Sequence, residues 1–358
     1  MTSHAEWTAK AQAEIDNKTK PVGSLGRLEQ WSVRLMALQQ TLKPIINNGH
    51  VLLFAADHGI ADDGVSQFPK VVTREMLRNL SSGGAAINAI CNANALKLSV
   101  IDVGVDTDET FTGIHVAKDI APHGTNSSLR GPAMTDAQLD AALSAGIEYA
   151  NAAIDSGAQA IAIGELGIGN TAVAAILLAA VSGKSAAQVT GKGTGVEGER
   201  YDHKVKVVEQ VLEKHNDVIK SREWREMFKC LGGLEIAAMA GAAVAVARSP
   251  KKPALLVDGY ISMVAFLFAI HLFPAEKELL GHCAFLSHAS AESGTRIAIT
   301  EIEKALGVSE GGMTPMLDIG FRLGEGTGAA LVFPILKAAG HIASDMNTFA
   351  GADVSGSN

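Results

Sequence analysis

The feature that most constrains the fold is an alternation of short apolar runs with longer helical patterns. The runs are continuous rather than alternating between polar and apolar residues, which is typical of strands covered on both faces. They are Val51–Ala56, Leu98–Val103, Ala158–Ile163, Ala254–Val257 and Ala284–Leu286. Helical patterns lie between them, so the chain is expected to form βαβ units. The sequence therefore predicts an α/β fold with a mostly parallel sheet and helices on both faces.

Two of the helical patterns have clear limits. Over Thr135–Ile154, Thr135 and Gln138 form a capping-box pattern, and apolar residues recur every four positions. A second pattern runs from about Arg200 to Lys214. The segment Asp106–Gly131 is rich in loop-forming residues, and no element is assigned to it.

The two ends of the chain differ from its middle. Glu6–Thr41 contains no strand pattern and indicates helices broken at Lys20–Gly23. Pro334–Met346 also has a helical pattern, followed by the tail Gly351–Asn358. We predict that residues 1–41 and 334–358 form a small helical subdomain beside a large α/β domain of residues 42–333.

Composition excludes several classes of protein. A formal net charge of −8 and 5% aromatic residues disfavour nucleic-acid binding, which needs a basic face or stacking platforms. Cys91, Cys230 and Cys283 do not form a disulfide framework, and we expect buried free thiols. Met1–Lys10 lacks the apolar core of a signal peptide, and the apolar run Ile261–Phe273 is too short to span a bilayer. We expect a cytoplasmic protein with neither nucleic acid nor membrane as a partner.

Ligands of open parallel sheets bind beyond the carboxyl ends of the strands. A polar or glycine-rich turn follows each predicted strand. These turns are Ala56-Asp57-His58-Gly59, Asp102-Val103-Gly104-Val105, Gly164–Thr171, Asp258-Gly259-Tyr260 and Ser287–Glu292. We therefore expect the strand ends to meet in one polar cleft.

Two glycine-rich loops are candidates for holding an anion. Gly164–Thr171 joins a buried strand to an alanine-rich helix, where backbone N–H groups and the helix dipole favour negative charge. The alternative is an ordinary turn in which Asn170 or Thr171 caps the helix. Thr190–Gly195 lacks the Gly-Lys-Ser/Thr ending of a nucleoside triphosphate loop. It is either a phosphate contact or a flexible connection.

A third glycine-rich segment, Phe321–Gly328, places Glu325 among glycines just before the apolar pattern Ala329–Leu336. A carboxylate at a helix start is commonly a partner of the helix dipole, but small neighbours also let a ligand reach it. The pairs Asp57-His58 and Ser287-His288 match no zinc-ligand spacing, so hydrogen-bonded histidines are favoured over a metallohydrolase site. No Gly-x-Ser-x-Gly motif supports a serine hydrolase.

Taken together, these motifs resemble the nicotinate-nucleotide–dimethylbenzimidazole phosphoribosyltransferase family over nearly the whole chain. The segments that carry the resemblance, in family order, are Lys20–Glu29, Ala56–Gly59, Gly83–Ala86, Gly164–Gly167, Asp258–Tyr260, Ser287–Glu292 and Arg322–Ala330. The resemblance implies a Rossmann-like parallel sheet with a small helical domain, and a homodimer.

The resemblance also implies roles for individual residues. Glu325 matches the catalytic base, and Glu165 and Lys204 match further catalytic positions. Phe68, Met76 and Leu166 fall where the family lines its base pocket. The remaining residues implied in substrate binding, mainly at the ribose phosphate, are Gly167, Gly169, Asn170, Thr171, Gly191, Gly193, Ser290 and Gly326. Phe68 and Met76 stand where some members have Ser and Gln, and Ala172 stands where members often have a second threonine.

The implied reaction transfers ribose 5-phosphate from nicotinate mononucleotide to 5,6-dimethylbenzimidazole. It gives α-ribazole 5'-phosphate and nicotinate, with inversion at the anomeric carbon. No metal or other cofactor is expected, because the leaving base is already a pyridinium. Two alternatives stay open: the same fold acting on another base, such as adenine or a phenol, or a non-catalytic homologue that binds a small molecule.

Overall fold

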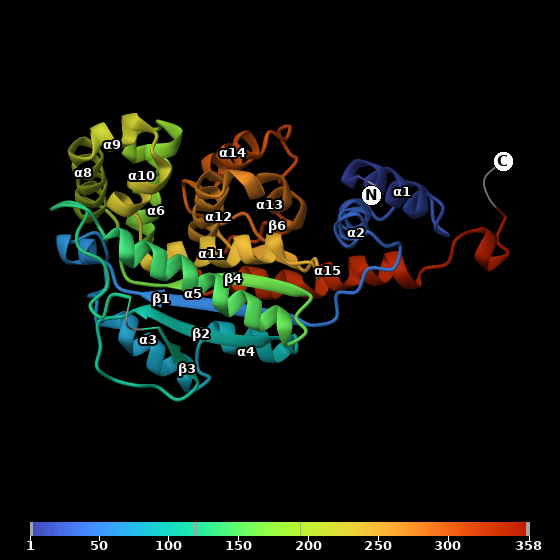
Figure 1. Cartoon of the computed structure of the whole chain (residues 1–358), viewed down its shortest axis with the longest axis horizontal. Coiled ribbons are helices and arrows are strands. Elements are labelled where there is room, and N and C mark those ends of the chain that lie inside the picture. Colours follow the sequence, from blue (N-terminus) through green and yellow to red (C-terminus); the bar gives the residue numbers. More distant parts are fainter. Residues whose placement is uncertain (1–2, 118–119, 194, 356–358) are drawn as a thin grey trace.

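The computed structural model describes residues 3–117, 120–193 and 195–355. At its centre is a six-stranded sheet in which all paired strands are parallel (Figure 1). The strands are β1 (Gly49–Ala56), β2 (Lys97–Gly104), β3 (Ile114–Val116), β4 (Ala160–Leu166), β5 (Ala254–Val257) and β6 (Ala284–Leu286), in the order β3-β2-β1-β4-β5-β6. The predicted α/β fold with a Rossmann-like parallel sheet is confirmed.

Two strands depart from the sequence prediction. The edge strand β3 lies in the loop-rich segment for which the sequence predicts no element, and its three residues are half-buried or exposed, so they carry no apolar run. β4 extends to Leu166, because Gly164, Glu165 and Leu166 pair in register with β1. These three residues therefore belong to a buried strand rather than to the turn after it.

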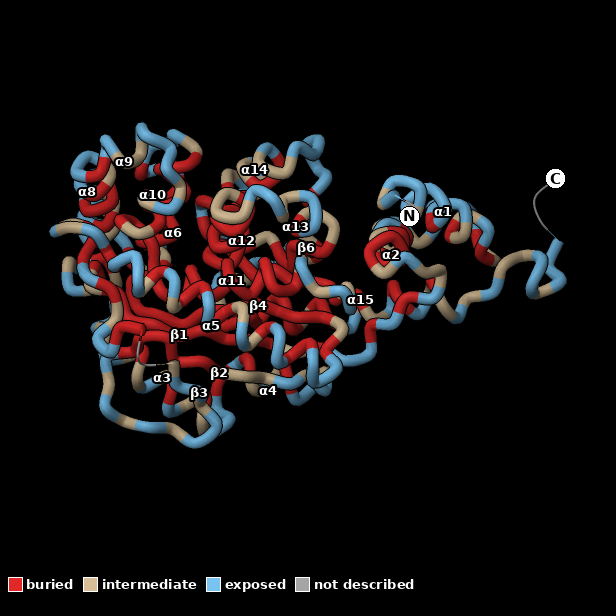
Figure 2. Tube along the Cα trace, in the orientation of Figure 1, coloured by how far each residue is buried: buried red, intermediate tan, exposed pale blue. Residues whose placement is uncertain are grey.

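Both faces of the sheet are covered. Every residue of β4, β5 and β6 is buried, although successive side chains point to opposite faces. Helices α4 (Ala86–Ala93) and α15 (Thr327–Asp345) pack together against the sheet, and α5 (Asp136–Asp155) and α11 (Leu234–Arg248) form a second pair against it. Figure 2 shows the central strands and α11 as one buried region.

The N-terminal helices α1 (His4–Asp16) and α2 (Arg27–Gln39) pack beside the C-terminal half of α15 (Figure 1). A separate small core joins the three helices, made of Ala11, Ile15, Val33, Met36 and Ala343. We propose that they form the helical subdomain. A boundary at residue 334 falls inside α15, because Pro334 is accommodated within that continuous helix.

The other helices surround the sheet and its loops. They are α3 (Val72–Ser81), α6 (Asn170–Ser182), α7 (Ala186–Val189), α8 (Glu199–Lys214), α9 (Asn216–Ser221), α10 (Trp224–Leu231), α12 (Tyr260–Leu272), α13 (Lys277–Cys283) and α14 (Thr295–Leu306). The predicted capping box of Thr135 and Gln138 begins α5, and the three cysteines are buried free thiols, as expected. Of the described helices, α15 alone is long and apolar enough to cross a membrane, but 56% of its most apolar stretch is buried in the protein.

Candidate active site

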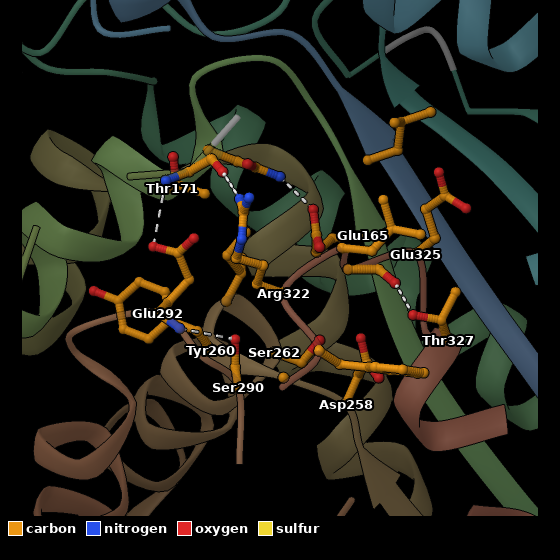
Figure 3. A pocket seen from close by; sticks show the side chains of 18 of the residues that line it. Glu165, Thr171, Asp258, Tyr260, Ser262, Ser290, Glu292, Arg322, Glu325 and Thr327 are labelled. Atoms are coloured by element: carbon orange, nitrogen blue, oxygen red, sulfur yellow. Dashed lines mark hydrogen bonds between the residues drawn. The ribbon is translucent and has the colours of Figure 1, made fainter. Parts of the chain in front are cut away.

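A cavity of about 650 Å³ lies beyond the carboxyl ends of β4, β5 and β6. One wall is apolar and comes from the start of α3, from α4 and from the end of β4. Its side chains are those of Phe68, Val72, Met76, Ala86, Ile90 and Leu166. The other wall is polar. Its side chains include those of Glu165, Asn170, Thr171, Asp258, Ser262, His288, Ser290, Glu292, Arg322, Glu325 and Thr327 (Figure 3).

The expectation that all five predicted strand ends meet in one cleft was wrong. The polar groups after β1 and β2 instead bind neighbouring backbone and side chains. Asp57 accepts the Asp106 N–H at 2.9 Å, and Asp102 accepts the Val105 N–H at 2.8 Å. His58 Nε2 lies 2.9 Å from Glu235 Oε1 in a fully buried pair. In the part of the chain that the structure describes, no group of three or more His, Cys, Asp or Glu side chains can hold a metal ion.

Glu325 occupies a tightly wound turn, and this explains its glycine neighbours. Gly324, Glu325 and Gly326 have φ angles of 88°, 60° and 76°, all in the left-handed region that glycine adopts without cost. The Glu325 N–H donates to the Glu165 carbonyl at 3.2 Å, which ties the turn to the end of β4. A side chain at Gly164 would lie 2.5 Å from the Gly326 nitrogen, so backbone meets backbone here.

The Glu325 carboxyl group is buried, with 5% of the residue exposed. It accepts a hydrogen bond from the Ile87 N–H in the first turn of α4, while its Oε2 atom has no hydrogen-bond partner among the described residues. One of the two interpretations of the sequence made Glu325 a partner of the helix that follows it, but the amide that Glu325 binds comes from α4. Burial raises the pKa of Glu325, the Ile87 amide lowers it, and the nearby Asp258 charge raises it further.

Glu165 lies at the end of β4, fully inside the protein. Burial raises its pKa to about 8, and the charges of Glu235 and Asp258 add to this effect. The side-chain amide of Asn170 donates to Glu165. The N-cap of α6 is Gly169, with a φ of 100° and no side-chain capping bond, so neither Asn170 nor Thr171 caps the helix as the alternative required.

The second glycine-rich loop borders the opposite end of the cavity. Lys204, on α8, reaches it from behind and donates to Thr171 Oγ1 at 3.0 Å and to the Gly191 carbonyl at 3.1 Å. Burial lowers the pKa of Lys204 to about 8. The Gly193 N–H donates to Glu292 Oε2 at 3.4 Å, and Arg322 donates to the Gly193 carbonyl at 2.8 Å (Figure 3).

Most of the residues implied by the resemblance are brought together. Those that line the cavity are Phe68, Met76, Glu165, Leu166, Gly167, Asn170, Thr171, Gly193, Ser290 and Glu325. Lys204, Gly169, Gly191 and Gly326 lie outside the lining, in the layer that supports it.

Four acidic or basic side chains of the cavity were not among the predicted site residues: those of Asp258, His288, Glu292 and Arg322. Each belongs to a segment that was singled out, either a turn after a strand or the glycine-rich segment of Glu325. For Asp258, His288 and Glu292 the only local signal was the position after a strand, and for Arg322 it was the neighbouring glycine-rich turn. Which side chains turn inward depends on the packing of distant elements.

Comparison with known proteins agrees with this architecture. A family model described as phosphoribosyltransferase matches residues 2–354. The nicotinate-nucleotide–dimethylbenzimidazole phosphoribosyltransferases of Geotalea uraniireducens and Geobacter metallireducens are each 40% identical, over 97% of this chain and 93% of their own length. The crystal structure of CobT from Thermus thermophilus superposes with a TM-score of 0.87 at 37% identity, covering 98% of this chain and 100% of that one. The chain therefore belongs to this phosphoribosyltransferase family.

Proposed function

We propose that the protein transfers ribose 5-phosphate from nicotinate mononucleotide to 5,6-dimethylbenzimidazole, with inversion at the anomeric carbon. The observation that carries this proposal is the position of Glu325. Its side chain lines the cavity and is largely buried, and the same cavity has an apolar wall. The named substrates are those of the relatives, and the cavity supplies a matching group for each part of them.

The apolar wall suits the acceptor base. Phe68, Val72, Met76, Ile90 and Leu166 present hydrocarbon and ring surface on one side of the cavity. A flat, methylated benzimidazole loses unfavourable contact with water when it packs there. These five side chains offer no strong hydrogen-bonding group, so the wall favours a methylated base over adenine, whose ring edge needs polar partners.

The acidic side chains of the polar wall suit the reaction. Glu165, Asp258 and Glu325 are buried carboxyl groups, and each has a pKa raised by burial. Nicotinate mononucleotide carries a pyridinium ring, and the anomeric carbon gains positive charge as the C–N bond breaks. A site that holds carboxylates where cationic charge develops stabilises that transition state.

Glu325 acts as the base in this proposal. One ring nitrogen of the acceptor attacks the anomeric carbon, and the electron pair of the breaking C–N bond returns to the nicotinate nitrogen. The other ring nitrogen then loses its proton to the Glu325 carboxylate, which lines the cavity. Burial gives this carboxyl group a higher proton affinity than an exposed glutamate, which suits a general base near neutral pH.

The 5'-phosphate belongs at the other end of the cavity. Thr171, in the first turn of α6, and Gly193, in the second glycine-rich loop, line this end, and Lys204 brings a buried ammonium behind them. Helix N-termini and glycine-rich loops of this kind bind phosphate. Ser290 and Glu292 border the same end and would contact the ribose.

We also propose a homodimer. Phe68, Val71, Ile319 and Leu323 are each at least 40% exposed, and Phe68 and Leu323 line the cavity. Apolar side chains gathered at the rim of a site mark a surface that a second subunit can cover. Light scattering coupled to size-exclusion chromatography would measure the mass, and a monomer at micromolar concentration would contradict this proposal.

The test of the transfer reaction is direct. The purified protein is incubated with nicotinate mononucleotide and 5,6-dimethylbenzimidazole, and free nicotinate and the riboside phosphate are measured by chromatography. Glu325→Gln should lower the turnover number by about 10²–10⁴. Glu303→Gln is the matched control, because Glu303 is a buried carboxylate that binds backbone amides away from the cavity. Near-full turnover of the Glu325 variant would contradict the assignment of Glu325 as the base.

A further inference from the structure

Asp258 is a buried carboxylate, and the proposed reaction does not use its hydrogen bonds. It follows β5, lines the cavity and is 1% exposed. Its Oδ1 atom accepts the Ala329 N–H at 2.8 Å, and the N–H groups of Gly259 and Gly328 also donate to its side chain. Gly328 and Ala329 belong to the first turn of α15, so a residue of the sheet binds the start of a distant helix.

This contact replaces the cap that α15 lacks. The first N–H groups of a helix have no partner within the helix and need one from elsewhere. The N-cap of α15 is Gly326, which has no side chain to provide one. Asp258 supplies the acceptor from β5, and a carboxylate at this position also interacts favourably with the helix dipole.

The helix start that Asp258 holds is directly continuous with the turn of Glu325. Two further contacts fix that turn: the Glu325 N–H donates to the Glu165 carbonyl, and Thr327 Oγ1 donates to the Gly324 carbonyl at 2.7 Å. The turn is therefore fixed to β4 on one side and, through Asp258, to β5 on the other. Figure 3 shows Asp258 beneath the segment that carries Glu325 and Thr327.

The charged groups around this turn come from several elements. The charge of Asp258 raises the pKa of both Glu325 and Glu165. The charge of Glu235, on α11, also raises the pKa of Glu165. His288 Nε2 lies 3.7 Å from Asp258 Oδ1, with neither ring nitrogen hydrogen-bonded.

The remaining charged groups of the site are farther along the cavity. Arg322 is hydrogen-bonded to the Gly193 carbonyl, and Glu292 and Lys204 lie with the same glycine-rich loop. On the Glu325 side the polar wall is therefore mainly acidic, and the charge of Asp258 raises the pKa of Glu325.

We propose that Asp258 is a positioning residue for the transfer reaction: it fixes the first turn of α15, and with it Glu325, and it adds a second carboxyl group to the cavity of that base. The inference rests on the proposed function for its catalytic part. Its structural part is independent of any reaction.

Two variants separate the two effects. Asp258→Asn keeps an oxygen that can accept the α15 amides but removes the charge. The acid limb of kcat/KM against pH should then move to lower pH, because Glu325 ionises more easily without a neighbouring anion. Asp258→Ala removes the acceptor as well, and its kcat should fall by about 10- to 100-fold with a smaller change in KM.

A double variant tests whether Asp258 acts through Glu325. In a Glu325→Gln background, Asp258→Ala should cause little further loss, because the base that it positions is already gone. Full additivity of the two losses would overturn the proposal. Glu303→Gln should match the wild type in every one of these measurements.

Amide hydrogen exchange provides a readout that needs no activity. In the wild type, the peptide that covers Gly324–Ala330 should be protected, and Asp258→Ala should lose that protection while Asp258→Asn retains most of it. Unchanged protection in Asp258→Ala overturns the positioning role, even if the wild type releases no nicotinate. If Asp258→Ala does not fold, the test rests on Asp258→Asn. An acid limb of kcat/KM at the same pH as in the wild type would then contradict the charge effect.

Discussion

Gly164→Ala is expected to disturb the site without touching any polar group. An added methyl group would lie 2.5 Å from the Gly326 nitrogen, 2.7 Å from its Cα and 2.8 Å from the Glu325 carbonyl carbon. All three are backbone atoms, so no side chain can rotate away. Ordinary contact begins near 3.4 Å, and the turn must therefore retreat from β4 by about 0.9 Å.

Two measurable effects follow from this displacement. Overpacking of a well-packed interior costs about 1–3 kcal/mol, which should lower the melting temperature by a few degrees. A shift of about 1 Å at a catalytic group can lower the rate by about 10²-fold. Because Glu325 moves while the base and phosphate ends of the cavity stay in place, kcat should fall more than KM rises.

The assay combines nicotinate release with thermal unfolding. Gly131→Ala is the matched control, because a side chain at Gly131 meets no atom within 4 Å. That variant should keep the wild-type kcat and melting temperature. If Gly164→Ala also kept both, the close approach of β4 to the Glu325 turn would not be what places the carboxyl group.

Three further predictions concern single side chains of the site. Met76→Gln adds a polar group to the apolar wall and should lower kcat/KM for 5,6-dimethylbenzimidazole relative to adenine by about 10-fold, measured in competition; an unchanged ratio would show that Met76 does not contact the base. Lys204 has a pKa lowered to about 8, so the KM for nicotinate mononucleotide should rise as the pH passes 8, whereas Lys204→Met should have a high KM from pH 6 to 9.5 without that inflection. The folded-state pKa of Glu165 is raised from 4.5 to about 8, so its contribution to stability is present below pH 4.5 and lost as the pH rises through 8. The melting temperature of Glu165→Gln should therefore rise relative to that of the wild type as the pH increases from 5 to 9. A difference in melting temperature that stays constant with pH would contradict this interpretation.

Local sequence patterns were sufficient for the main elements. The strands β1, β2, β4, β5 and β6 were predicted because continuous apolar runs between helices have few other structures available. The edge strand β3 was not, because half-exposed residues in a loop-rich segment carry no such pattern. The cap of α5 was also predicted, because both of its partners lie within four residues of each other.

The candidate site was also predicted only in part. The glycines around Glu325 marked a special turn, and the family motifs named the acid itself. Neither indicated that the carboxyl group accepts its hydrogen bond from the start of α4. The expected cleft of five strand ends became a cavity beyond three, because the Asp57 and Asp102 side chains bind nearby backbone amides instead.

The sequence by itself determined the parallel sheet, the glycine-flanked acid and the membership of a family, since each is written in contiguous residues or in their order. Only the tertiary structure decided which acids share the cavity and how their proton affinities are shifted. Asp258 and Glu325 are far apart in the chain, and their interaction exists because β5 and the start of α15 are packed side by side. Burial and charge depend on distances through space, and these are fixed only when the sheet and its helices assemble.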